Sequence, residues 1–197
     1  MQRLIDRPRV AFQGELGAYS EEAVEQYWCG AAVPVASRTC INVLQALSAG
    51  RVEYGVLPIN NTLIGPIVAA QEALAASPHV AVIGEITIAI RHALLALPGA
   101  TLTGLTSIFS HPAALAQCGN FLQQHPHLVI HESYDTAGAA RDIAANGRLE
   151  EGAIAGLRAA ERYGLMIVAA DIQDSATNQT LFAIVARDAH SRERDRC

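Results

Sequence analysis

The chain of 197 residues contains no lysine, since all fourteen of its basic residues are arginines. A Schiff base needs a primary amine, so imine chemistry on a lysine side chain is excluded. The formal net charge of −5 gives no reason to expect a nucleic acid as partner. Aromatic residues make up only 5% of the chain, so alanine and aliphatic side chains must fill the core. With 51% hydrophobic residues, the chain can build one domain, or two lobes, around a sizeable core.

The sequence also lacks paired cysteines. Its four cysteines, Cys29, Cys40, Cys118 and Cys197, form no C-x-x-C motif, so zinc sites and thioredoxin-like redox sites lack support. Signal peptides and long apolar spans are missing as well, which predicts a cytoplasmic protein with reduced thiols and no membrane association. Residues 187–197 are charged and show no apolar periodicity, which is typical of a solvated tail.

Short apolar runs alternate with amphipathic segments along the chain. Strands are predicted at residues 10–12, 54–59, 80–90, 93–97, 107–109, 128–130, 152–155, 165–169 and 182–186. Helices are predicted to begin at a capping Ser20 and to cover residues 38–50, 65–76, 112–124, 137–146 and 157–163. Strand followed by helix is the order typical of an α/β fold with largely parallel sheets.

Polar turns recur where the predicted strands lead into helices, at residues 17–20, 60–62, 110–111 and 135–136. In a parallel sheet these junctions share one edge, which therefore collects hydroxyls, amides and helix N-termini with few formal charges. Such an edge suits a small anion held by backbone N–H groups. Taken alone, each turn is equally well explained as a plain connection between a strand and a helix.

Thr180 lies at the beginning of the last predicted strand. It follows the polar turn 174–177 and leads into the apolar run 182–186. This places one hydroxyl at a strand end, where open α/β sheets bind their ligands. The alternative is a threonine that is present for its high strand propensity.

Seven segments, in this order, resemble the catalytic domain of prephenate dehydratase. The matching segments are 14–20, 55–62, 84–95, 110–118, 135–140, 153–165 and 178–182. The resemblance covers Val10 to Val185. It implies a two-lobed α/β fold of the type II periplasmic-binding-protein kind, with mostly parallel sheets and the active site in a cleft between the lobes. Residues 1–186 would form the catalytic domain, with one lobe of about 1–77 plus 172–186 and the other of about 78–171.

Members of this family convert prephenate into phenylpyruvate, with loss of carbon dioxide and of the ring hydroxyl. The resemblance implies that no metal and no organic cofactor is needed. It makes Thr180, in the family's N-x-T-R-F motif, the general acid at the leaving hydroxyl. It also assigns substrate-binding positions to the residues around the polar junctions: Ala18, Ser20, Asn60, Asn61, Thr62, Thr136, Leu181 and Phe182.

The sequence departs from the family pattern at these site positions. Leu181 stands where the motif has arginine, Asn60 where it has glutamate, Ala18 where it has threonine and Asp135 where it has serine. Because the scaffold segments are kept while polar site positions change, altered chemistry is favoured over general decay. Charge-assisted hydrogen bonds lost with the arginine are worth about 1.5–3 kcal/mol each. An ionised Asp135 facing a dianionic substrate would repel it further.

Three functions remain open at this point. The favoured one is decarboxylation of prephenate without aromatisation, as in a short branch of the family that retains the ring hydroxyl. The second is ordinary prephenate dehydration in phenylalanine biosynthesis. The third is an inactive module that only binds a carboxylate, although retention of Thr180 weighs against it. The resemblance also implies a homodimer, and the chain stops before the family's phenylalanine-sensing ACT domain, so we expect no allosteric response to phenylalanine.

Overall fold

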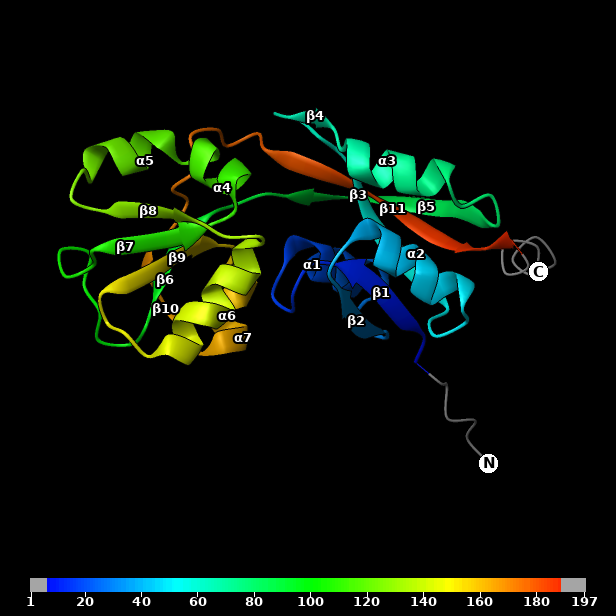
Figure 1. Cartoon of the computed structure of the whole chain (residues 1–197), viewed down its shortest axis with the longest axis horizontal. Helices are drawn as coiled ribbons and strands as arrows, with labels where there is room; N and C mark the ends of the chain where they lie inside the picture. The colour runs from blue at the N-terminus through cyan, green and yellow to red at the C-terminus, as the bar shows by residue number, and fades with distance from the viewer. Residues whose placement is uncertain (1–6, 189–197) are drawn as a thin grey trace. The chain divides into compact units, whose positions relative to one another are not determined.

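The computed structural model describes residues 7–188. These residues form two compact units (Figure 1). Unit 1 comprises residues 7–14, 20–88 and 179–188, and unit 2 comprises residues 15–19 and 89–178. The alternation of strands and helices confirms the predicted α/β class.

Unit 1 is built on a six-stranded sheet with the strand order β2-β1-β3-β11-β5, in which β4 pairs with β3. Its strands are β1 (Arg9–Gln13), β2 (Val33–Ser37), β3 (Tyr54–Asn61), β4 (Gly65–Pro66), β5 (Val80–Ala89) and β11 (Gln179–Arg187). Strand β1 runs parallel to β2 and β3, whereas β11 runs antiparallel to β3. The amino end of β11 therefore meets the carboxyl end of β3.

The helices of unit 1 are α1 (Tyr19–Tyr27), α2 (Cys40–Ser48) and α3 (Val68–Ala75). Helix α2 is capped by Thr39, whose Oγ1 accepts the backbone N–H of Asn42 at 3.1 Å. It packs closely on β3 at Gly55, where an added Cβ would lie 2.8 Å from a methyl carbon of Val185 and 2.9 Å from one of Val43. A side chain at position 55 would therefore push the helix away from the sheet.

Unit 2 is built on a five-stranded sheet with the order β10-β6-β9-β7-β8. Its strands are β6 (Ala93–Ala96), β7 (Ser107–Ser110), β8 (Val129–Glu132), β9 (Glu151–Ala155) and β10 (Met166–Ala169). Its helices are α4 (Pro112–Gln117), α5 (Gly119–Gln124), α6 (Thr136–Asn146) and α7 (Leu157–Tyr163). Strand β7 runs parallel to β8 and β9, and the other two pairings are antiparallel.

Helices cover both faces of the sheet in unit 2, as Figure 1 shows for α4 on one side and α6 and α7 on the other. Successive residues of β6 point to opposite faces. Ala93 and Leu95 belong to the apolar cluster under α6 and α7, while Leu94 and Ala96 belong to the cluster under α4. Strand β6 is therefore buried on both faces.

Both sheets are mixed rather than mostly parallel. In unit 1 both β4 and β11 run antiparallel to β3, and β11 follows unit 2 in the chain and inserts between β3 and β5. Strand β5 belongs to the same sheet, so unit 1 continues to residue 88 instead of ending near residue 77. Residues 172–178, expected in the first lobe, belong to unit 2. Strand order is a long-range property that the local pattern does not contain.

Three local predictions also need correction. Strand β2 was not predicted, because its short apolar run is interrupted by Pro34. The helix predicted over residues 112–124 is divided at Cys118 into α4 and α5. The second helix starts afresh because the carboxylate of Asp174 accepts the backbone N–H groups of Gly119 and Asn120. Helix α1 begins at Tyr19, so Ser20 lies inside its first turn and is not its cap.

Within residues 7–188, no helix has the length and apolar composition that crossing a membrane requires. The solvated tail was predicted over residues 187–197. Residues 189–197, including Cys197, lie outside the described residues.

Two cysteines with opposite surroundings give a test of this packing. Cys118 is fully buried, and its burial together with the negative charge of Asp174 raises the pKa of its thiol to about 12. Cys29 is exposed at the end of α1. Since the thiolate is the reactive form, Cys118 should be about 10⁻⁴ ionised at pH 8 and should resist iodoacetamide while Cys29 is alkylated. Peptide mapping by mass spectrometry measures both, with the unfolded chain as control. Equal labelling of the two in the folded protein would contradict the packing described.

Candidate active site

The paired ends of β3 and β11 bring Thr180 next to Asn61. The amide Nδ2 of Asn61 donates a hydrogen bond to Thr180 Oγ1 at 2.9 Å, and its Oδ1 accepts the backbone N–H groups of Leu63 at 2.9 Å and Ile64 at 3.2 Å. Both side chains are buried, with 5% of Asn61 and 7% of Thr180 exposed. Because Asn61 donates to the oxygen of Thr180, the hydroxyl proton of Thr180 does not take part in this hydrogen bond.

Thr62 holds the first residue of β11. Its backbone N–H donates to the carbonyl of Gln179 at 2.9 Å, and its Oγ1 accepts the backbone N–H of Gln179 at the same distance. One lone pair of the Thr62 hydroxyl is thus used to fix the strand that carries Thr180. The substrate-binding role expected for Thr62 stays a prediction.

Asn60 and Leu181 lie directly opposite one another in the β3–β11 ladder. Both side chains are half-buried. The register shifts by one residue between Leu181 and Phe182, which leaves an extra residue on β3, a bulge of the kind that re-aims side chains next to active sites. Phe182, with only 2% of its surface exposed, packs in the interior, and this accounts for its position better than contact with a substrate would.

The glycine-rich turn from Gly14 to Ser20 is shaped by close packing. Gly17 has a φ of +91°, and a Cβ at this position would lie 3.0 Å from the Cα of Ala159. Ala18 is buried in the apolar cluster of unit 2 with Ala137 and Ala159, and Ser20 is buried in unit 1. Ala18 therefore serves packing in this structure. A ligand contact by either residue stays a prediction.

The carboxyl ends of β7 and β8 form a second polar edge, because these strands are parallel. The residues that follow them begin helices: His111 Nδ1 accepts the backbone N–H of Ala113 at 3.1 Å, and Asp135 Oδ1 accepts that of Gly138 at 2.7 Å. Ser110 is turned inward, where its hydroxyl donates to the carbonyl of Ile154 at 2.6 Å. Thr136 is the first residue of α6 and is half-buried.

The surroundings of Asp135 act on the pKa of its carboxyl group in opposite directions. Burial of the carboxyl group raises its pKa above the ordinary value of 3.8. The backbone N–H groups of Gly138 and Ala137 lower the pKa, the nearby Glu15 raises it and His111 lowers it, but burial is the largest influence. The carboxyl group of Asp135 consequently keeps its proton to higher pH than an exposed aspartate.

A second polar cluster, which the sequence analysis did not find, surrounds Glu15. Its carboxylate accepts the phenol proton of Tyr134 at 2.7 Å and forms an ion pair with Arg141 at 2.9 Å. The phenol of Tyr163 donates to the carbonyl of Leu16 at 2.6 Å. Burial and the hydrogen bond to Glu15 raise the pKa of Tyr134 to about 12. These contacts hold residues 15–19 against unit 2. The one local feature that could have indicated this cluster is the acidic residue Glu15 between two glycines.

A buried network in unit 2 holds the residue that leads into β11. Asn178 Nδ2 donates to Gln117 Oε1 at 2.9 Å, and the same oxygen lies 2.9 Å from Nε2 of His92. Tyr19 contacts the other ring nitrogen of His92 at 3.2 Å and donates to the carbonyl of Arg91 at 2.6 Å. Burial lowers the pKa of His92, with the hydrogen bond to Gln117 acting in the opposite direction. These contacts give His92 a structural role between β5 and β6.

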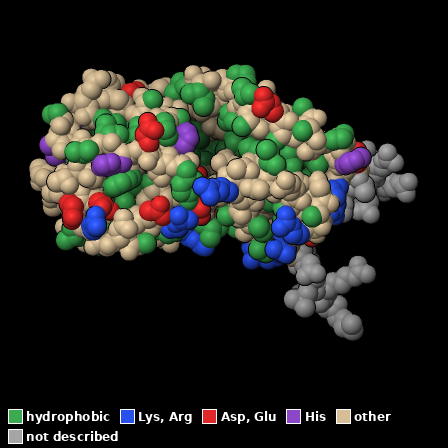
Figure 2. All heavy atoms as spheres, in the orientation of Figure 1, with side chains coloured by type: hydrophobic (Ala, Val, Ile, Leu, Met, Phe, Trp, Pro, Cys, Tyr) green, Lys and Arg blue, Asp and Glu red, His purple; other side chains and the backbone are tan. Residues whose placement is uncertain are grey.

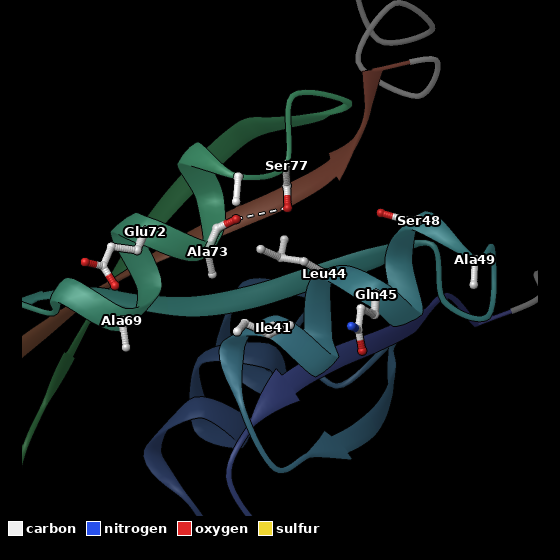
Figure 3. A pocket seen from close by; sticks show the side chains of 10 residues that line it. Ile41, Leu44, Gln45, Ser48, Ala49, Ala69, Glu72, Ala73 and Ser77 are labelled. Carbon is white, nitrogen blue, oxygen red and sulfur yellow. Dashed lines mark hydrogen bonds between the residues drawn. The ribbon is translucent and has the colours of Figure 1, made fainter.

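A mostly apolar groove of unit 1 is separate from these polar junctions. It has a volume of about 830 Å³ and lies between α2 and α3, where Leu44 and Ala73 lie between the two helices (Figure 3). Apolar side chains also gather on the surface over these helices (Figure 2), including the exposed Ile41 and Val68. No junction residue lines this groove, so it is not the candidate site for a charged substrate.

Asn61 gives a test of the β3–β11 edge. Replacing it by alanine removes the bond to Thr180 and the acceptor for two backbone N–H groups, so Asn61→Ala should lower the free energy of unfolding by about 1–3 kcal/mol. Asn42→Ala, at an exposed amide of α2, is the matched control and should change it by less than about 0.5 kcal/mol. Urea unfolding measures both. Equal losses would show that the Asn61 amide does not hold this edge together.

Asp135 predicts a specific pH dependence of stability. Its pKa in the folded state is raised, so the carboxyl group stabilises the fold below the unfolded value near 3.8, and this contribution is lost as pH rises through the folded pKa. Asp135→Asn keeps a capping side chain without the charge and should be more stable than the native protein at pH 7, by about 1.4 kcal/mol per unit of pKa shift. The gain should shrink toward pH 4 in thermal unfolding. If the stability of Asp135→Asn relative to the native protein were lower at pH 7 than at pH 4, the pKa of Asp135 would be lowered by folding and not raised.

Comparisons with known proteins agree on one family. The family model described as "PDT: Prephenate dehydratase" matches residues 10–190. The chain is 42% identical over 183 residues to "Arogenate dehydratase/prephenate dehydratase 2, chloroplastic" of Arabidopsis thaliana. The matched segment covers 92% of this chain and 47% of the relative. It is also 42% identical to "Arogenate dehydratase 2" of Petunia hybrida, with 92% and 45% covered. The chain thus spans about half the length of these curated relatives.

Solved structures give the same result. A prephenate dehydratase from Arthrobacter aurescens, in complex with L-Phe, superposes with a TM-score of 0.83 at 29% identity, covering 91% of this chain and 60% of that one. A protein described as GqqA, a novel type of quorum quenching acylase, gives 0.82 at 34% identity, with 91% and 64% covered. A periplasmic substrate-binding protein of an ABC transporter from Coxiella burnetii, at 18% identity and a TM-score of 0.50 over 94% and 87% of the chains, shares the fold. The type II periplasmic-binding-protein-like fold is thereby confirmed, and the chain belongs to the prephenate dehydratase family.

Proposed function

We propose that this protein is a lyase that acts on prephenate and decarboxylates it without aromatising the ring. Family membership supports the substrate class and the lyase chemistry. The choice of decarboxylation rests on one observation, the direct pairing of Asn60 with Leu181 beside Thr180.

Leu181 and Asn60 occupy the two positions at which the family motifs have arginine and glutamate. Because the ladder places these positions opposite one another, the two departures form a single change across the β3–β11 pair. Losing one member of an opposite-charge pair leaves a half-buried charge without its partner, which is strongly destabilising, whereas losing both is tolerated. The joint replacement therefore supports a site that has been altered as a unit, with its fold maintained.

The altered pair changes what the site can do for each reaction path. Dehydration needs a proton at the ring hydroxyl, a poor leaving group, while the substrate is held in line. Thr180 keeps its hydroxyl and its bond to Asn61, but the neighbouring cation that would hold the substrate is replaced by an apolar side chain. Loss of carbon dioxide disperses the negative charge of a carboxylate. A less polar environment destabilises the carboxylate of the ground state more than the transition state, so it favours decarboxylation.

Ordinary dehydration remains the second candidate, since the named relatives are arogenate and prephenate dehydratases. Arogenate is accordingly an alternative substrate of the same site. We further propose that the enzyme works in the cytoplasm as a homodimer and needs neither metal nor organic cofactor. An inactive carboxylate-binding module would bind prephenate without turnover.

The product decides between these functions. Incubation of the purified protein with prephenate should release carbon dioxide and give a hydroxycyclohexadienyl pyruvate that retains the ring oxygen. Mass spectrometry and NMR identify this product, and arogenate serves as the parallel substrate. Phenylpyruvate as the main enzymatic product would return the chain to ordinary dehydration, and absence of turnover with both substrates would favour the binding module.

Restoring the charged pair tests the observation behind the proposal. Asn60→Glu together with Leu181→Arg should shift the product toward phenylpyruvate, and by more than the two single variants combined, because each single variant places one unpaired charge at the site. Leu181→Met is the control without charge and should keep the native product ratio. A double variant whose product ratio equals that of the native protein would show that this pair does not select the path.

A further inference from the structure

A buried histidine of unit 2, His92, is not used by the proposed reaction. Only 2% of its surface is exposed, and both of its ring nitrogens have polar partners. Nδ1 lies 3.2 Å from the phenol oxygen of Tyr19, and Nε2 lies 2.9 Å from the side-chain amide of Gln117. The same end of the Gln117 amide is bonded at 2.9 Å to Asn178, which is 1% exposed. All four residues belong to unit 2.

The hydroxyl of Tyr19 decides which ring nitrogen of His92 carries a proton. A phenol has one proton, and Tyr19 donates it to the backbone carbonyl of Arg91 at 2.6 Å. The phenol oxygen then accepts from the ring, so Nδ1 of His92 is a donor. With a bare Nδ1, either the ring nitrogen or the carbonyl of Arg91 would face the phenol oxygen with no proton between them.

The role of the second ring nitrogen depends on the charge of the ring. In an imidazolium, Nε2 donates, and Gln117 presents its oxygen, to which the amide of Asn178 also donates. In a neutral ring, Nε2 accepts, so Gln117 has to present its NH₂ group. The two hydrogens of that group then bond to Nε2 and to the amide oxygen of Asn178. Each charge state therefore fits one orientation of the two amides, and the number of hydrogen bonds in the network is the same in both.

We propose that His92, Gln117 and Asn178 form a proton switch, in which protonation of the ring reverses both side-chain amides. The oxygen and the NH₂ group of an amide are nearly indistinguishable in shape, so the reversal needs no repacking. Among residues 7–188, Nε2 of Gln117 makes no hydrogen bond, so no such bond opposes the reversal of this amide. The switch lies within unit 2 and does not depend on the product of the reaction.

The switch joins the segment before β6 to the segment before β11. The backbone N–H of Ile90 donates to the carbonyl of Asn178 at 2.8 Å, and that of His92 donates to Gln173 Oε1 at 2.8 Å. The backbone N–H of Ile172 donates to the carbonyl of His92 at 3.0 Å. The charge of His92 is thus transmitted to the side chain of Asn178, which directly precedes β11.

The surroundings of His92 favour the neutral ring at pH 7. Burial lowers the pKa of His92 from its ordinary value of 6.5, and the hydrogen bond to Gln117 acts in the opposite direction. Proton uptake, and with it the reversal, is therefore expected on acidification below pH 6.5. The other titratable or charged groups in or next to the network are Tyr19, Arg91, Cys118, Asp171 and Asp174.

Heteronuclear NMR of the full chain tests the switch. At pH 7 the ring of His92 should show a protonated Nδ1 and a bare Nε2. On acidification Nε2 should gain a proton, and the side-chain NH₂ signals of Gln117 and Asn178 should shift with the same midpoint. The NH₂ signals of Gln123, which is exposed on α5, are the internal control and should not follow this midpoint.

A charged variant holds the network in one of its two states. Gln117→Glu fixes the accepting orientation, because a carboxylate can only accept. The titration midpoint of His92 should rise by about 1–3 pH units beside the opposite charge, and the Asn178 signals should shift much less across the titration. Gln123→Glu adds the same charge at an exposed position of α5 and should leave the midpoint at its native value.

Three results would overturn the switch. If the ring titrates while the NH₂ signals of Gln117 and Asn178 stay constant, the amides do not reverse. A bare Nδ1 in the folded protein would show that Tyr19 does not set the tautomer of His92. A ring that keeps one charge state over the whole pH range in which the chain is folded would exclude switching. None of these results bears on the proposed lyase function, which is judged by its product.

Discussion

The hydrogen bond between Asn61 and Thr180 joins two residues that are 119 positions apart in the chain. It forms because β11 returns from unit 2 and inserts antiparallel between β3 and β5. The same pairing uses Thr62 to fix Gln179 and sets Asn60 against Leu181. The polar edge of unit 1 thus depends on the register of this one ladder, and a slip by one residue would turn Thr180 toward the opposite face of the sheet.

The polar edges of the two units differ in their charge. At the β3–β11 edge the residues are amides, hydroxyls and a leucine, whereas the edge of unit 2 carries Asp135 with Glu15, Arg141 and His111 close by. In the resemblance, the arginine and glutamate positions are both on the first edge. Of the four departures from the family pattern, two remove a charged residue at the first edge and one, Asp135, adds a carboxyl group at the start of α6.

Much of the fold and part of the site could be predicted from local pattern. The helix α2 within residues 38–50, the helix at Leu157–Tyr163 and the alternation of strands and helices all arise from residues within a turn or two of one another. The polar junctions were visible because Asn61 and Thr62 follow the apolar run 54–59 closely, and Asp135 and Thr136 directly precede the predicted helix over residues 137–146. The break at Cys118 was not visible, because it depends on Asp174, which lies far along the chain.

The sequence by itself determined the α/β class, the polar strand ends and the family, because hydrophobic period, turn residues and motif order are carried by neighbouring residues. Only the tertiary structure decided that β11 is antiparallel, that Leu181 faces Asn60 and that Ala18 is buried against Ala137 and Ala159. It also decided which way burial shifts the pKa of Asp135. These properties depend on which distant segments pack together, and burial and register are fixed only when those segments meet.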